Sequence, residues 1–232
     1  MKAIVLAGGH GSRLLPLTES TNKTMIKIDG KPIIDYILNS IQSCGITDIT
    51  IVANKFIDDI RNHVGGVAKF VHEDIPKGVG NALGLARDGN EGAEILIWFA
   101  DNLTNLNLRL EVENFDSGCV LLAREVSEPS AFGVVKYLEG KIVDIIEKPE
   151  NPPSNIAIGG IYIFDKRFWE IYDSVYPNSD FSISDITREY VKTGSAKTVT
   201  IGSNSWIDCG THDGLKTAND LVNEGIIRFG DY

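Results

Sequence analysis

The sequence contains few cysteines and no long apolar run. Its three cysteines, Cys44, Cys119 and Cys209, are widely spaced and form no CxxC pair, so we expect reduced thiols and neither a disulfide framework nor a zinc site. No apolar run approaches the length of about 18 residues that spans a membrane, and the apolar residues 3–7 are too few for a signal peptide. We therefore expect a cytoplasmic protein that is not a membrane protein.

Positive charge is also scarce, because 22 Lys and Arg residues stand against 32 Asp and Glu residues, giving a net charge of −10. Such a chain is not expected to bind nucleic acid, and an anionic membrane surface should repel it. An anionic ligand must then be held by a few locally placed cations and backbone amides. The hydrophobic fraction of 43% over 232 residues is ordinary for a globular protein and excludes a disordered chain.

Short apolar runs alternate with helical patterns through the first 125 residues. We expect strands over residues 2–7, 46–53, 68–72, 94–100 and 118–124, and helices over residues 31–44, 56–64, 78–87 and 106–115. Apolar strands that alternate with helices predict a parallel sheet covered on both faces. The predicted fold class is therefore α/β.

The pattern changes after residue 125. We expect a hairpin of residues 133–137 and 141–146, strands over 157–164, 196–201 and 206–208, and helices over 166–174, 184–193 and 211–224. No linker or repeat interrupts the chain. Residues 1–232 are therefore predicted to form a single domain with a mixed, mainly parallel sheet.

A glycine-rich loop follows the first predicted strand. Gly8, Gly9 and Gly11 let backbone amides approach a ligand closely, and Arg13 adds a cation, which suits a polyphosphate. A tight turn with a surface arginine is the alternative. The loop is not a Walker A motif, and Leu14 stands where the dinucleotide fingerprint needs its third glycine.

The loop is the first of a series of motifs. In chain order they are residues 6–18 (LAGGHGSRLLPLT), Asn22-Lys23, Lys31-Pro32, Lys77-Gly78, residues 100–102 (ADN), 132–135 (FGVV), 147–149 (EKP), 159–162 (GGIY) and 206–212 (WIDCGTH). This series, over about residues 1–220, resembles the sugar-1-phosphate nucleotidylyltransferases. It is most similar to a short form of the glucose-1-phosphate thymidylyltransferase branch, because little follows the last predicted helix.

The resemblance implies a Rossmann-like three-layer fold and a Mg²⁺-dependent reaction. The phosphate oxygen of a sugar 1-phosphate would attack the α-phosphorus of a nucleoside triphosphate, with dTTP or UTP favoured, giving an NDP-sugar and pyrophosphate. Arg13 would hold the triphosphate and the leaving pyrophosphate, and Lys23 would lie near the α-phosphate. The nucleotide contacts implied for residues 1–125 are Leu6, Ala7, Gly8, Gly9, Gly11, Ser12, Arg13, Glu73 and Gly78.

The resemblance also places a metal and a sugar phosphate. Asp101 follows an apolar run, at the carboxyl end of a predicted strand where open sheets bind ligands, and Asp208 ends another strand; both would hold Mg²⁺. The sugar-phosphate contacts are implied mainly for residues 126–232, with Lys148 on the phosphate. The full set is Asn102, Gly133, Glu147, Lys148 and Gly160. A homo-oligomer is expected from the family alone.

Two residues depart from the thymidylyltransferase pattern. Glu73 stands where that branch has a glutamine, and a carboxylate only accepts hydrogen bonds, so it suits the N–H donors of guanine better than thymine. Ser182 stands where the family often has an acid that faces the sugar. A guanylyl- or cytidylyltransferase of the same fold, acting on another sugar 1-phosphate or a phosphorylated alcohol, therefore stays open. A non-catalytic regulatory subunit that binds nucleotide sugars is a second alternative.

Overall fold

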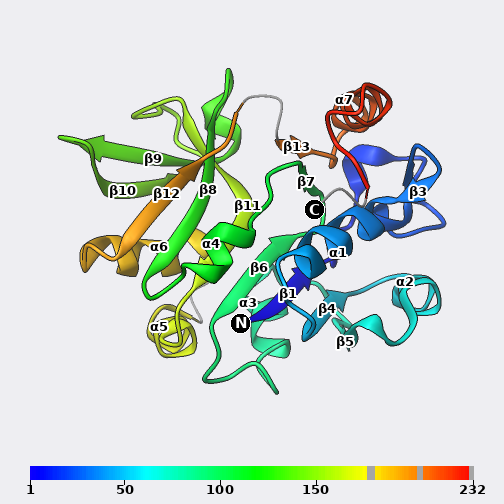
Figure 1. Ribbon diagram of the computed structural model, residues 1–232, viewed down its shortest axis with the longest axis horizontal. Coiled ribbons are helices and arrows are strands. Elements are labelled where there is room, and N and C mark those ends of the chain that lie inside the picture. Colours follow the sequence, from blue (N-terminus) through cyan, green and yellow to red (C-terminus); the bar gives the residue numbers. More distant parts are fainter. Residues whose placement is uncertain (177–180, 203–205, 230–232) are drawn as a thin grey trace.

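A nine-stranded mixed sheet forms the centre of the computed structural model, which describes residues 1–176, 181–202 and 206–229 (Figure 1). The strand order is β10-β9-β11-β6-β1-β4-β5, and β8 pairs with both β11 and β12. The strands are β1 (Lys2–Leu6), β4 (Ile49–Ala53), β5 (Lys69–His72), β6 (Ile95–Phe99), β8 (Cys119–Glu125), β9 (Gly133–Leu138), β10 (Lys141–Glu147), β11 (Ile156–Phe164) and β12 (Ala196–Thr200).

Strand direction changes at β11. β1 pairs in parallel with β4 and β6, and β4 pairs in parallel with β5. β11 runs antiparallel to β6, β8 and β9, while β12 returns in parallel beside β8. The predicted mixed sheet is thus confirmed, and its four adjacent parallel strands, β6, β1, β4 and β5, belong to the N-terminal half of the chain.

Helices cover both faces of the sheet, because successive strand residues point to opposite sides. In β1, Ala3 and Val5 belong to one buried cluster and Ile4 to the other. The first face carries α1 (Ile33–Ser43), α2 (Ile57–Val64) and α7 (His212–Asn223), and the second carries α3 (Val79–Leu85), α5 (Phe168–Val175) and α6 (Ile183–Lys192). The fold therefore has the three predicted layers.

Smaller elements lie beside the carboxyl ends of the central strands β1 and β6. β7 (Asn102–Thr104) follows β6 and pairs antiparallel with β13 (Trp206–Asp208), which places Asp208 opposite Asn102. Short 3₁₀ turns include η1 (Ser12–Leu14) and η2 (Lys23–Met25), and η3 (Gly65–Val67) and η4 (Pro129–Ala131) lie further along the chain. Segments more than 100 residues apart in the sequence thus meet at one end of β6.

The structure corrects three of the predicted boundaries. Lys31–Pro32 is not the start of a helix but a strand, β3, which pairs with β2 (Lys27–Ile28), so α1 begins at Ile33. The helix expected over residues 106–115 is only α4 (Arg109–Glu113), which buries none of its own side chains. The strand expected from residue 46 begins at Ile49.

The predicted hairpin of β9 and β10 is confirmed. Its two turn residues, Glu139 and Gly140, have φ angles of 50° and 77°, as a tight hairpin turn requires.

Among the described residues, no helix is both long enough and apolar enough to cross a membrane.

Candidate active site

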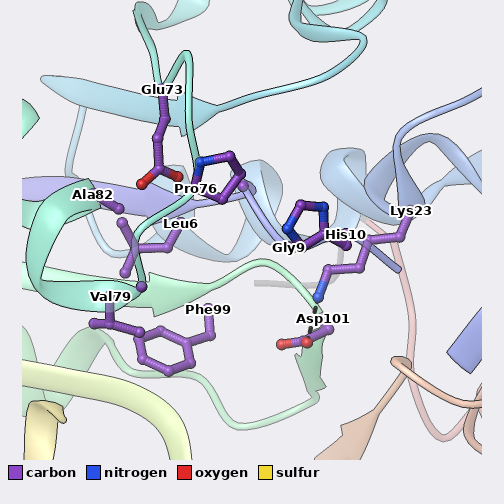
Figure 2. A pocket seen from close by; sticks show the side chains of 12 residues that line it. Leu6, Gly9, His10, Lys23, Glu73, Pro76, Val79, Ala82, Phe99 and Asp101 are labelled. Carbon is purple, nitrogen blue, oxygen red and sulfur yellow. Dashed lines mark hydrogen bonds and ion pairs between the residues drawn. The ribbon is translucent and has the colours of Figure 1, made fainter. Parts of the chain in front are cut away.

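A cavity of 380 Å³ opens at the carboxyl ends of β1 and β6 (Figure 2). Its lining comes from the glycine-rich loop, from the segment between β5 and α3, and from the residues that follow β6. These residues are Leu6, Gly8, Gly9, His10, Lys23, Glu73, Pro76, Gly78, Val79, Ala82, Phe99 and Asp101. The cavity is therefore apolar along its walls and charged at Lys23, Glu73 and Asp101.

Glu73 lies at one end of this cavity and is 3% exposed. Its Oε1 accepts hydrogen bonds from Asn81 Nδ2 at 2.8 Å and from the Lys77 amide at 3.4 Å. A Cβ on Gly8 would lie 2.7 Å from the other oxygen, Oε2, so only glycine leaves that oxygen its space. Hydrogen bonds to the protein thus fix Glu73 Oε1, whereas Oε2 lies beside Gly8 of the glycine-rich loop.

The opposite end of the cavity holds a cluster of charges. Lys23 Nζ lies 2.5 Å from Asp101 Oδ2, as the dashed line in Figure 2 marks. Arg13 reaches to 3.9 Å from Asp208 Oδ2, with its side chain largely exposed. Burial and then repulsion by Asp101 raise the pKa of the Asp208 carboxyl, while the Gly210 amide, Arg13 and Lys23 act in the opposite direction.

The two aspartates fit a hard divalent cation. Asp208 stands opposite Asn102 in the β7–β13 ribbon, and the Cys209 amide donates to the Asp101 carbonyl at 2.6 Å. The two aspartates therefore lie on neighbouring segments of the polypeptide. A cation between them would offset the burial and the repulsion by Asp101 that raise the pKa of Asp208, and carboxylate oxygens are the ligands that Mg²⁺ prefers. Asp101 and Asp208 are therefore the residues that could hold a metal ion.

A second cavity, of 460 Å³, adjoins the first and shares Gly78, Val79, Phe99 and Asp101 with it. Its other lining residues come mainly from β7, β9, the end of β10, β11 and the start of α6. They include all five residues predicted for the sugar phosphate, namely Asn102, Gly133, Glu147, Lys148 and Gly160, and also Asp208. The structure thus brings the predicted sugar residues to one cavity that meets the first at Asp101.

Close packing fixes several of these residues. Glu147 Oε2 accepts a hydrogen bond from Ser184 Oγ at 2.9 Å. Asn102 is 5% exposed, and its amide donates to Asp101 Oδ1 at 2.7 Å and to the Phe99 carbonyl at 3.2 Å. The Asn102 side chain therefore also fixes the metal candidate Asp101, a contact that the sequence did not indicate.

The remaining predicted nucleotide residues lie around a third cavity of 270 Å³ or behind the loop. Ser12 lines this third cavity together with Asn22, Asn54 and Lys55. Ala7 is fully buried, and Gly11, with a φ angle of 64°, packs against Thr18. Ala7 and Gly11 therefore support the loop backbone without lining any of the three cavities, whereas Gly8 and Gly9 line the first cavity.

Sequence reasoning missed the polar residues that hold the site in place. Asn81 and Ser184 each donate to a carboxylate that lines a cavity, and Asn54 donates to the Gly8 carbonyl. Only Asn54 carries a sequence signal, because it directly follows β4 at the carboxyl end of a parallel strand. The other two are ordinary helix residues whose partners are distant in the chain.

Comparison with known proteins agrees with this geometry. A family model described as nucleotidyl transferase matches residues 2–225. A low-salt glycan biosynthesis nucleotidyltransferase of Haloferax volcanii is 29% identical over 97% of this chain, and the chain spans 66% of that relative's length. A glucose-1-phosphate thymidylyltransferase of Mycobacterium tuberculosis is 30% identical, with 96% of this chain and 82% of the relative covered.

A solved structure is also similar over the whole chain. It is described as a glucose-1-phosphate thymidylyltransferase from Bacillus anthracis in complex with a sucrose. The TM-score is 0.90 at 32% sequence identity, and the match covers 100% of this chain and 98% of that chain. The layers and the strand order described above are therefore those of a solved protein fold.

We predict that Gly160→Ala destabilises the fold at the second cavity. An added Cβ would lie 2.6 Å from Asn102 Nδ2 and 2.7 Å from Phe99 Cβ, so the protein must shift at a cost of about 1–3 kcal/mol in the free energy of unfolding. Urea denaturation measures the loss. The matched control is Gly66→Ala, whose Cβ meets nothing within 4 Å; equal stability of the two variants would contradict the packing described here.

Proposed function

The chain belongs to the nucleotidyl transferase family, and we propose that it joins a nucleoside triphosphate to a sugar 1-phosphate, giving an NDP-sugar and pyrophosphate. The observation that carries the proposal is the meeting of two cavities at Asp101. One cavity has the apolar walls and buried carboxylate that a nucleotide needs, and the other has the polar groups that a sugar phosphate needs. The names of the relatives support the same reaction class and, of the expected dTTP and UTP, favour dTTP.

Both reactants are anions, so positioning and charge neutralisation are the main tasks of this site. Lys23, which lines the first cavity and pairs with Asp101 where the two cavities meet, would lie beside the α-phosphate, and Arg13 would hold the outer phosphates and the leaving pyrophosphate. Asp101 and Asp208 would hold Mg²⁺, which supplies positive charge to the phosphates when it is bound. No side chain needs to act as a nucleophile, because the sugar phosphate oxygen attacks directly.

The second cavity would receive the sugar 1-phosphate. Glu147 can accept hydrogen bonds from sugar hydroxyls with the oxygen that Ser184 leaves free, and Lys148 would hold the phosphate. Gly133 and Gly160 line this cavity, and a Cβ at either position would come within 3.2 Å of a neighbouring side chain, so both positions favour glycine. A cytoplasmic location and a homo-oligomeric state stay predictions.

We expect pyrophosphate release only when a nucleoside triphosphate, a sugar 1-phosphate and Mg²⁺ are all present. The measurement is a matrix of dTTP, UTP, GTP, CTP and ATP against common sugar 1-phosphates, with and without EDTA. Turnover that needs both substrates and is lost with EDTA supports the proposed reaction. Binding without pyrophosphate release across the whole matrix would instead support the regulatory subunit.

Arg13→Ala should lower turnover far more than stability. The Arg13 side chain is 62% exposed, so the fold gains little from it, whereas a charged hydrogen bond to a phosphate is worth about 1.5–3 kcal/mol. We therefore expect kcat/KM to fall at least tenfold with little change in Tm. The control is Arg109→Ala, which is 61% exposed and also paired with a carboxylate. Equal losses of activity and stability for Arg13→Ala would indicate a structural turn.

The base preference should change in Glu73→Gln. The Glu73 carboxylate only accepts hydrogen bonds, whereas a glutamine amide can also donate to a carbonyl oxygen of thymine or uracil. We expect the ratio of kcat/KM for dTTP over GTP to rise by about tenfold, equivalent to one hydrogen bond of roughly 1.4 kcal/mol. Competition assays with both nucleotides measure the ratio. Glu113→Gln, far along the chain and half exposed, should leave it unchanged.

A further inference from the structure

Two buried asparagines hold successive carbonyl groups of the glycine-rich loop. Asn22 Nδ2 donates to the Ala7 carbonyl at 3.0 Å, and Asn54 Nδ2 donates to the Gly8 carbonyl at 2.5 Å. The asparagines are 4% and 5% exposed. Both amides are therefore withdrawn from water and hold the loop backbone, and the Asn22 amide also donates to the Lys55 carbonyl at 3.4 Å.

The two asparagines come from separate segments. Asn54 directly follows β4, whereas Asn22 precedes η2, the turn that carries Lys23. Asn22 Oδ1 accepts hydrogen bonds from the Thr24 amide at 3.0 Å and the Thr24 hydroxyl at 2.9 Å. One side chain thus links the glycine-rich loop to the turn that presents Lys23 to Asp101.

The carbonyl contacts also fix the direction of two amide N–H groups. A trans peptide is planar, and its N–H points opposite to its C=O. The N–H groups of Gly8 and Gly9 therefore point away from Asn22 and Asn54. Both glycines line the first cavity, and Gly9 also borders the third cavity, whereas the two asparagines line the third cavity and not the first. Within the described residues, neither glycine N–H donates a hydrogen bond to the protein.

We propose that Asn22 and Asn54 are positioning residues that turn the Gly8 and Gly9 amides towards the bound nucleotide. The inference rests on the proposed function, because it takes the first cavity as the nucleotide site. Two successive backbone donors without a partner among the described residues are suited to the oxygen atoms of a nucleotide. Since the amides are oriented before binding, no free energy is spent on turning them when the ligand arrives.

The test separates loop orientation from general stability. Asn22→Ser keeps an oxygen that can cap Thr24 but is too short to hold the Ala7 carbonyl, and Asn54→Ala removes the contact with Gly8. The matched control is Asn90→Ala. Asn90 is 2% exposed and donates to the Ala86 carbonyl at 2.7 Å, outside all three cavities.

We expect all three variants to lose similar amounts of Tm. In Asn22→Ser and Asn54→Ala, kcat/KM for the nucleoside triphosphate should fall at least tenfold while KM for the sugar 1-phosphate changes by less than about twofold; tenfold corresponds to roughly 1.4 kcal/mol. The control should keep both constants. If Asn22→Ser and Asn54→Ala lose no more kcat/KM than Asn90→Ala, the asparagines are structural and the inference is overturned.

A second measurement on the unchanged protein covers variants that fail to fold. In a ¹⁵N-glycine-labelled sample, the Gly8 and Gly9 amide signals should shift when the tightest-binding nucleotide among dTTP, UTP, GTP and CTP is added. Saturation without a shift of either signal overturns the inference even if turnover is normal. Shifts in a protein that releases no pyrophosphate support the positioning role and reject only the proposed reaction.

Discussion

Compensation of buried negative charge at the end of β6 determines how this site is organised. Asp101 and Asp208 lie on neighbouring segments of the polypeptide, and burial together with repulsion by Asp101 raises the pKa of Asp208. Lys23, brought from the segment between β1 and α1, forms an ion pair with Asp101 at 2.5 Å, and Arg13 approaches Asp208. The two cations come from the start of the sequence, Asp101 from its middle and Asp208 from near its end, so the site forms only when these distant segments have folded together.

The same arrangement explains how an acidic chain can bind anions. With a net charge of −10, the average field of the protein repels phosphate groups. A local group of Arg13, Lys23, Lys148 and loop amides can still attract them, because charge interactions in water are screened beyond about 10 Å at ordinary ionic strength. The carboxylates near these cations are the groups that suit a divalent metal, and most other acids lie on the solvated surface.

The sequence predicted the sheet, the helical layers and several of the residues that line the two main cavities, among them Glu73, Asp101 and Glu147, because these depend on periodicity and on motifs that are local in the chain. It did not predict Asn81 or Ser184, which contact Glu73 and Glu147 only after the chain has folded. The strand β3 was missed because pairing with β2 overrides the helical periodicity at Lys31–Pro32. Periodicity therefore locates the layers, whereas the contacts that orient the site depend on tertiary structure.

Under the proposed function, the residues for base choice and for sugar choice lie in separate cavities of this molecule. Glu73 lines only the first cavity and Glu147 only the second, and the shared wall between them is formed by Val79 and Phe99 together with Gly78 and Asp101. Phe99 packs on the Tyr162 ring at a centroid distance of 5.8 Å, so this wall is anchored to β11 in the core. Because each glutamate lines only one of these two cavities, a change at one carboxylate should leave the lining of the other cavity intact.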